Sequence, residues 1–215
     1  FNFIGGAAGC IAAVSAASNV MAEHDINKIV SLCVEHILNQ YPDPSIIPKV
    51  RKEFDKSLVG FSHGVTGIAW ALANFAPPHY QQRVNIWVDD ALDYERNHFS
   101  SAHANWTDLR VDNGDYDYKF WCHGAAGIAL AKMDMPVKWQ DEQLKNEISI
   151  AIKSTLGVKY GNVQNLCHGD SGNLDILWHY AKGSNDDKLK SWVQSNASHM
   201  MAAICEGNYQ ADKPS

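Results

Sequence analysis

Apolar side chains recur at helical spacing in four long segments of the chain. In each segment they fall at positions i, i+3, i+4 and i+7, which brings them to one face of an α-helix. The segments are 25–41, 80–98, 141–156 and 186–203. The sequence shows no convincing alternation of apolar and polar residues of the kind that marks a β-strand. The pattern therefore predicts an all-α protein.

A shorter apolar stretch precedes each of these segments, and a G-x-x-G sequence introduces it. The glycine pairs are Gly6 and Gly9, Gly64 and Gly67, Gly124 and Gly127, and Gly169 and Gly172. The stretches that follow them are 10–21, 68–75, 128–133 and 173–180. Self-similarity of this kind indicates a repeat architecture. We expect each repeat to be a helical hairpin, with a short inner helix after the glycines and a longer outer helix.

The residues just before each glycine pair are predicted to gather at one end of the molecule. A helix that starts at a crowded centre favours glycine, either for a positive φ or for close backbone approach. Hairpins that pack side by side bury their faces against their neighbours. Four such units predict an arc of an α/α toroid, with repeats that begin near residues 5, 63, 123 and 168. An arc leaves two flanks exposed, so closure would need further repeats outside residues 1–215 or a partner, and we expect the sequence to be part of a longer protein.

The positions expected near the toroid axis carry His63, Cys122-His123 and Cys167-His168. Thiolate and imidazole are ligands that zinc prefers, and three protein ligands with a fourth position open are typical of catalytic zinc. The two cysteines lie too far apart in sequence for a zinc ribbon or finger, so only the repeat geometry brings them together. The alternative is that the cysteines are buried thiols and the histidines cap helix starts.

Composition narrows the classes of protein. The formal net charge of −6 gives no electrostatic reason to expect a nucleic-acid partner or an anionic membrane. The longest apolar run, 4–17, is too short to span a bilayer and lacks a preceding basic region, so we expect a cytoplasmic protein without a transmembrane segment. The chain has five cysteines, and an odd number argues against a disulfide framework. Cys10 and Cys33 are expected to be small buried hydrophobic residues.

Three motifs resemble the hallmark sequences of the lanthionine synthetase C-like family. They are FSHGVTGIAWAL at 61–72, WCHGAAGI at 121–128 and LCHGDSGNL at 166–174. YERNHF at 94–99 and NWTDLR at 105–110 are similar to the cyclase half of the bifunctional class II, LanM-type, lanthipeptide synthetases. The resemblance covers essentially the whole chain.

The resemblance implies an α/α toroid of seven hairpins around a central Zn²⁺, of which residues 1–215 would hold about four. It also implies that Cys122, Cys167 and His168 are the metal ligands and that His63 is a central acid/base residue. The activity implied is a Michael addition of a peptide Cys thiol to dehydroalanine or dehydrobutyrine. The implied partners are a dehydrated precursor peptide and a fused or associated dehydratase.

In this reaction zinc would deprotonate the substrate thiol, whose ordinary pKa is about 8.5, and an imidazole would protonate the resulting enolate. We assign the proton transfer to His63 first and to His123 second. Two departures from the family concern these roles. Class I cyclases carry Arg four residues before the first zinc Cys, where this chain has Tyr118, and Tyr after that Cys, where it has His123.

The remaining features have simpler interpretations. Asp108 and Arg110 lie in a polar segment that also holds Asp112, Asp115 and Asp117. We expect a solvated acidic loop with one internal ion pair, and a substrate-facing loop is the alternative. Asp170 is expected to cap a helix or to interact with its dipole. Residues 94–96 are expected to pack or to bridge hairpins, and the tryptophans are expected to pack.

Two other functions are considered beside the cyclase. The first is a non-catalytic zinc-containing module that binds thiol peptides or glutathione-like ligands. The second is a carbohydrate-active toroid. That class needs paired inward Asp or Glu residues, whereas the axial positions here carry Cys and His.

Overall fold

The protein is built mainly from helices that pair into hairpins. The computed structural model describes residues 2–46, 57–110, 117–161 and 163–210. The shorter, inner helices are α1 (Ala7–Ala16), α3 (Val65–Phe75), α5 (Ala125–Met133) and α7 (Asp170–Gly183). The longer, outer helices are α2 (Glu23–Gln40), α4 (Gln81–Arg96), α6 (Glu142–Leu156) and α8 (Asp187–Cys205). The predicted all-α fold class and the alternation of short and long helices are confirmed.

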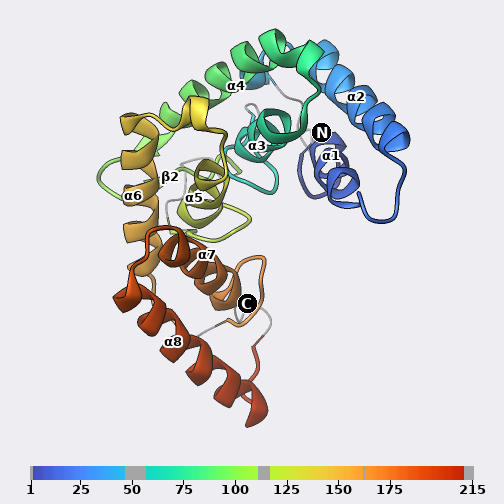
Figure 1. Cartoon of the computed structure of the whole chain (residues 1–215). Helices are drawn as coiled ribbons and strands as arrows, with labels where there is room; N and C mark the ends of the chain where they lie inside the picture. The colour runs from blue at the N-terminus through green and yellow to red at the C-terminus, as the bar shows by residue number, and fades with distance from the viewer. Residues whose placement is uncertain (1, 47–56, 111–116, 162, 211–215) are drawn as a thin grey trace.

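The hairpins follow one another around an arc (Figure 1). The inner helices lie on the concave side of the arc, and the outer helices form its convex side. Each inner helix contacts the next inner helix along the arc, and each outer helix lies against its own inner helix. This arrangement is a section of an α/α toroid, as the repeat pattern predicted.

Every inner helix begins three residues earlier than the sequence predicted, because both glycines of each pair belong to the helix start. The first glycine of each pair is the N-cap residue, and the second is the third helical residue. A Cβ atom on the second glycine would lie 1.9 or 2.0 Å from the carbonyl oxygen six residues earlier, in all four repeats. No side chain fits at that distance. The glycines therefore let each helix start press against its own preceding loop.

The outer helices begin within two residues of their predicted positions, and side-chain caps mark two of the starts. Asp141 accepts a hydrogen bond from the Leu144 N–H at 2.7 Å, and Asp186 accepts one from the Leu189 N–H at 2.9 Å. Asp170 is the first residue of α7, where its charge suits the helix dipole, but the cap position itself is a glycine. No helix within the described residues is both long enough and apolar enough to cross a membrane.

Short elements fill the connections between the helices. They are the 3₁₀-helices η1 (Pro44–Ile46), η2 (Pro78–Tyr80) and η3 (Val137–Trp139), and the strands β1 (Phe99–Ser100) and β2 (Asn105–Trp106). The strands pair antiparallel, with Phe99 opposite Trp106. The sequence did not predict them because two residues are too few to show an alternating pattern.

The hydrophobic core runs along the arc between the two layers of helices. The five tryptophans expected to pack are all buried in it or partly buried against it: Trp70, Trp87, Trp139, Trp178 and Trp192. Cys33 also packs against the core, but the prediction for Cys10 is wrong, because its side chain is exposed. Cys10 lies on α1, the last inner helix at one end of the arc, where no further described hairpin covers it.

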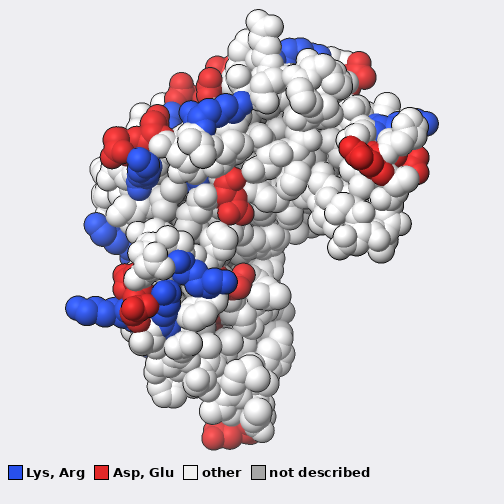
Figure 2. Space-filling view, viewed as in Figure 1, with Lys and Arg blue, Asp and Glu red and all other residues white. Residues whose placement is uncertain are grey.

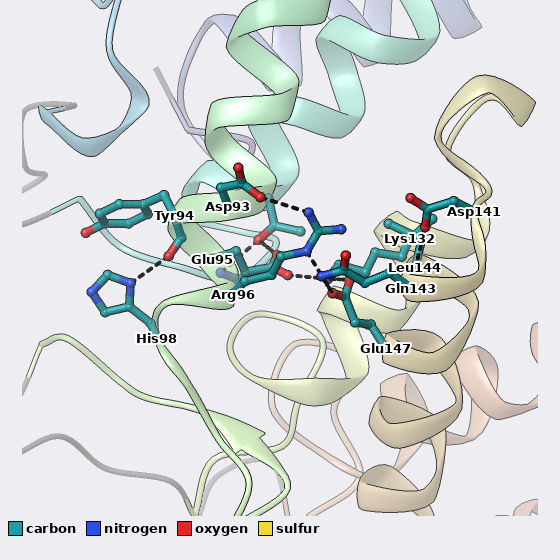
Figure 3. Close-up of polar contacts among 12 residues, drawn as sticks. Asp93, Tyr94, Glu95, Arg96, His98, Lys132, Asp141, Gln143, Leu144 and Glu147 are labelled. Atoms are coloured by element: carbon teal, nitrogen blue, oxygen red, sulfur yellow. Dashed lines mark hydrogen bonds and ion pairs between the residues drawn. The ribbon is translucent and has the colours of Figure 1, made fainter.

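A cluster of buried charges joins the second hairpin to the third (Figure 3). Lys132 of α5 is completely buried, and its Nζ lies 2.6 Å from Glu95 Oε1 of α4 and 2.7 Å from Glu147 Oε2 of α6. Arg96 at the end of α4 donates from Nε to Glu147 Oε1 at 2.7 Å. Residues 94–96 therefore bridge two hairpins, as predicted. Water does not reach the cluster freely, so the attraction between these charges is needed to offset the cost of burying them.

Replacing Lys132 by Ala should destabilise the protein strongly. The change leaves Glu95, which is 1% exposed, as a buried charge without its cation, and breaking such a pair costs about 3–5 kcal/mol. Lys145→Ala removes a lysine from an exposed pair with Glu142 and should cost about 0.5 kcal/mol or less. Urea unfolding of both variants measures the difference. Equal losses would contradict a supporting role for the cluster.

The stabilising effect of Glu147 should disappear in acid. Burial alone would raise its pKa, but the charges and hydrogen bonds of Lys132 and Arg96 hold the pKa below its ordinary value. Its contribution to stability is therefore full above the pKa of an unfolded glutamate and is lost as the pH falls through the folded pKa. The stability difference between wild type and Glu147→Gln should shrink over that range. Glu142→Gln, at an exposed position, should show no such change.

Candidate metal centre

Backbone hydrogen bonds join the loops that precede the inner helices. Ile4, Ser62, Cys122 and Cys167 hold the same place in the four repeats, two residues before each first glycine. The N–H of each of the first three donates to the carbonyl of the equivalent residue in the next repeat, at 3.2, 3.3 and 3.1 Å in chain order. We call this run of bonds the central ladder. It fixes equivalent residues of neighbouring hairpins side by side.

The last step of the central ladder brings two thiols and one imidazole together. One ligand atom from each of Cys122, Cys167 and His168 lies within 4.8 Å of the other two. All three residues are partly buried. The sequence prediction that these residues meet is therefore confirmed by the structure.

The chemistry of this donor set suits a zinc ion. Burial first and the neighbouring Cys167 second raise the pKa of Cys122 to about 12. The Cys122 thiol would therefore stay protonated without a nearby cation to compensate its negative charge. Two thiolates and one imidazole are ligands that zinc accepts, and they leave one position of a tetrahedral ion for another ligand. The residues fit the metal that the sequence motifs implied.

An aromatic column backs the central ladder. Phe3, Phe61 and Trp121 each precede a ladder residue, and their ring centroids are 4.6 Å apart for the first pair and 5.6 Å for the second. Tilted aromatic contacts of this kind stabilise packing beyond the area that they bury. The fourth residue of the column is Leu166, which is 68% exposed. The column therefore stiffens the loops up to Cys122 and ends at the fourth repeat.

His63 follows the ladder residue Ser62 and is partly buried. Its Nδ1 lies 3.2 Å from Asn2 Nδ2, within hydrogen-bond distance. Burial lowers its pKa, and the positive charge of Arg110 lowers it further. The lowered pKa favours the neutral form of the imidazole.

His123 occupies a different environment. It is 4% exposed, and its Nε2 lies 3.7 Å from Asp108 Oδ1. Arg110 binds the same carboxylate, with Nε at 2.9 and 3.0 Å from the two oxygens and Nη2 at 2.5 Å from Oδ2. The structure therefore brings His123 together with Asp108, and the group of candidate metal ligands does not include it.

The expectation of a solvated acidic loop is correct only in part. The internal ion pair exists between Asp108 and Arg110, but Asp108 is 2% exposed and therefore not solvated. Burial would raise its pKa, yet the hydrogen bonds of Arg110 outweigh burial and keep the carboxyl ionised. Asp117 is exposed, and Asp112 and Asp115 lie outside the described residues.

Asn105 explains why this segment is buried. Its side-chain amide donates to the Tyr118 carbonyl at 2.8 Å, and its side-chain oxygen accepts from the Ala125 N–H at 2.9 Å. These bonds fix residues 105–110 to the loop and helix start of the third repeat. Sequence reasoning did not assign Asn105 a role in the site. The available signal was its place at the start of the NWTDLR motif.

The two faces of the arc differ in chemical character. In the space-filling view of Figure 2 most Lys, Arg, Asp and Glu side chains lie along the convex edge, over the outer helices. The concave side is hollowed and is lined in this view mainly by uncharged residues. The inner side is therefore the less charged face for a ligand to approach.

An arc of helical hairpins, with a Cys₂His group that could hold a metal ion at the starts of two inner helices, defines a protein of the α/α toroid class. The family model for "Lanthionine synthetase C-like protein" matches residues 1–213. The chain belongs to this family.

The chain is similar to known proteins, among them one biosynthesis protein and one cyclase of solved structure. The lacticin 481/lactococcin biosynthesis protein LcnDR2 of Lactococcus lactis subsp. lactis is 29% identical over 153 residues, which cover 66% of this chain and 16% of that protein. The solved structure of nisin cyclase matches with a TM-score of 0.70 at 15% identity and covers 94% of this chain and 56% of its own. The structural match shows the toroid fold. The chain thus spans only part of the length of each.

Removing one cysteine of the cluster should abolish metal binding. Native mass spectrometry of the protein loaded with Zn²⁺ should find one ion per chain, and Cys122→Ala should lose it because two ligands bind zinc far more weakly than three. Cys33→Ala removes a thiol outside the cluster and should keep the ion. Retention of the metal by Cys122→Ala would contradict the assignment.

Proposed function

We propose that this protein is a zinc-dependent lanthipeptide cyclase. It would join a cysteine thiol of a dehydrated peptide to a dehydroalanine or dehydrobutyrine of the same peptide, forming a lanthionine or methyllanthionine thioether ring. Membership of the lanthionine synthetase C-like family supports the reaction class. The observation that carries the proposal is the convergence of two thiols and one imidazole from separate repeats.

Cys122, Cys167 and His168 would hold the zinc ion. A bound zinc ion supplies Lewis acidity, which favours the thiolate form of a sulfur ligand at neutral pH. The chain's contribution is to position the ligands, because the hydrogen bond from the Cys122 N–H to the Cys167 carbonyl fixes the two loops before any ion binds. Preorganised ligands lower the entropy cost of binding the metal.

His63 would move the proton that the reaction releases and then requires. The substrate thiol loses one proton when its sulfur attacks, and the α-carbon of the product gains one. The neutral imidazole of His63 can accept the first proton and return it to the α-carbon. His123 remains the second candidate, and its burial against Asp108 favours a positioning role over direct contact with the peptide.

The dehydrated substrate requires a second activity. Dehydroalanine and dehydrobutyrine form when Ser and Thr residues lose water, so a dehydratase must act before the cyclase. We propose that this dehydratase is fused to the protein or associated with it. The part of LcnDR2 that matches the chain is a small share of a much longer biosynthesis protein, which favours fusion.

A peptide that has been dehydrated separately tests the proposed reaction. Ring formation does not change the mass of the peptide, so its free thiols are counted by alkylation and mass spectrometry. The wild-type protein with Zn²⁺ should consume thiols faster than a no-enzyme control, and Cys122→Ala should match that control. Undiminished thiol with wild type would reject the cyclase. If the wild-type protein consumed no thiol but still bound the peptide, the cyclase proposal would give way to a non-catalytic module that binds thiol peptides.

A further inference from the structure

We propose that Arg110 is a substrate-binding residue of this site, which donates hydrogen bonds to the carbonyl oxygen of the dehydro residue while the thiol adds. Asp108 is the positioning residue that holds the guanidinium in place. The inference rests on the proposed cyclase function and adds to it the group that stabilises the developing negative charge.

Asp108 and Arg110 form a short, bidentate ion pair. The carboxylate accepts from the Arg110 side chain at Nε and Nη2 and also from the Arg110 backbone N–H, at 2.9 Å. A two-pronged bond of this kind fixes the plane of the guanidinium as well as its position. Because Asp108 is 2% exposed, the anchor itself is held by the protein interior.

This anchored pair lies beside the candidate metal centre. Asp108 is 3.7 Å from the imidazole of His123, the residue that follows Cys122. The side chain of Asn105 ties the same segment to the third-repeat loop. Arg110 is bonded to Asp108, so the guanidinium belongs to the group of side chains around the loop that carries Cys122 and His123.

Arg110 keeps donors available for a ligand. In the part of the chain that the structure describes, its hydrogen bonds all go to Asp108, through Nε, Nη2 and the backbone, and Nη1 has no protein partner. The side chain is 36% exposed, in contrast to the buried carboxylate that holds it. One edge of the guanidinium is therefore bound and the other faces outward, as a site for an anionic or carbonyl oxygen requires.

The reaction develops negative charge where such a donor can act. The sulfur lone pair forms the bond to the β-carbon, and the π electrons of the carbon–carbon double bond move onto the α-carbon and its carbonyl oxygen. The oxygen carries enolate charge until a proton reaches the α-carbon and restores the carbonyl. One proton leaves the thiol and one is gained at carbon, so no oxidant or reductant is needed. A cation held in place beside this oxygen therefore lowers the energy of the transition state for addition.

The alternative is that Arg110 only stabilises the folded protein and does not contact the substrate. If it only neutralised the buried Asp108, its replacement would lower stability and would leave the rate of the folded fraction unchanged. An externally supplied guanidinium ion would then have no effect on the rate.

Arg110→Ala is therefore assayed on the separately dehydrated peptide, with and without millimolar guanidinium chloride. We expect kcat to fall on the order of 10²–10³-fold with a smaller change in KM, the effect of losing one oxyanion donor. We expect guanidinium to restore part of the loss in Arg110→Ala and none in Cys122→Ala. Zinc content by native mass spectrometry should equal that of wild type. Arg110→Lys, which keeps the charge but not the fork, should recover only part of the rate.

Arg83→Ala is the matched control, because Arg83 is an exposed arginine of α4 that binds Asn39, and its rate should equal that of wild type. If Arg110→Ala does not fold, Asp108→Asn/Arg110→Ala, which leaves no unpaired buried charge, replaces it in the rescue assay. A wild-type rate in the Arg110 variant, loss of its zinc, or absence of rescue overturns this inference alone. A wild-type protein that consumes no thiol overturns the cyclase proposal and this inference together.

Discussion

The hydrogen bonds of the central ladder are the constraint on which the candidate site depends. Each one pairs the N–H of a loop residue with the carbonyl of the equivalent residue in the next repeat, so the repeats stay in register. The backbone is thus the same at each step while the side chain varies. The position is Ser62 in the second repeat, where Oγ donates to the Cys122 carbonyl at 3.1 Å, and cysteine in the next two. The candidate metal-binding group arises here from repeat geometry, because its cysteines come from different repeats.

A second set of contacts links the outer layer to these loops. Lys132 pairs with Glu95, the Thr66 hydroxyl donates to the other oxygen of the Glu95 carboxylate, and Thr66 Oγ1 accepts from the Gly60 N–H at 3.2 Å. A Cβ atom on Gly60 would lie 3.5 Å from the imidazole of His123. The charges between the hairpins thereby support the loops that carry the candidate catalytic histidines. The contacts that hold the hairpins together are thus continuous with those that position the site.

Much of this architecture could be predicted from the sequence because it repeats. The glycine pairs placed the four hairpins and aligned Cys122 with Cys167, and the described structure agrees on both points. Sequence reasoning placed the inner helix starts three residues late, since glycine was expected before the helix and not within its first turn. It also missed the burial of Asp108, which depends on the long-range bonds of Asn105 and leaves no periodic signal.

The position of the cysteine cluster affects the order in which the hairpins unfold. Cys122 belongs to the third hairpin, and Cys167 and His168 belong to the fourth. An ion held between them would therefore cross-link two units that otherwise meet through helix packing and a few hydrogen bonds, among them the last step of the central ladder. In proteins built from stacked units, each boundary contributes its own share to stability. Chelation would therefore weaken one boundary selectively, and α7 with α8 would detach as a unit before the remaining hairpins lose their order.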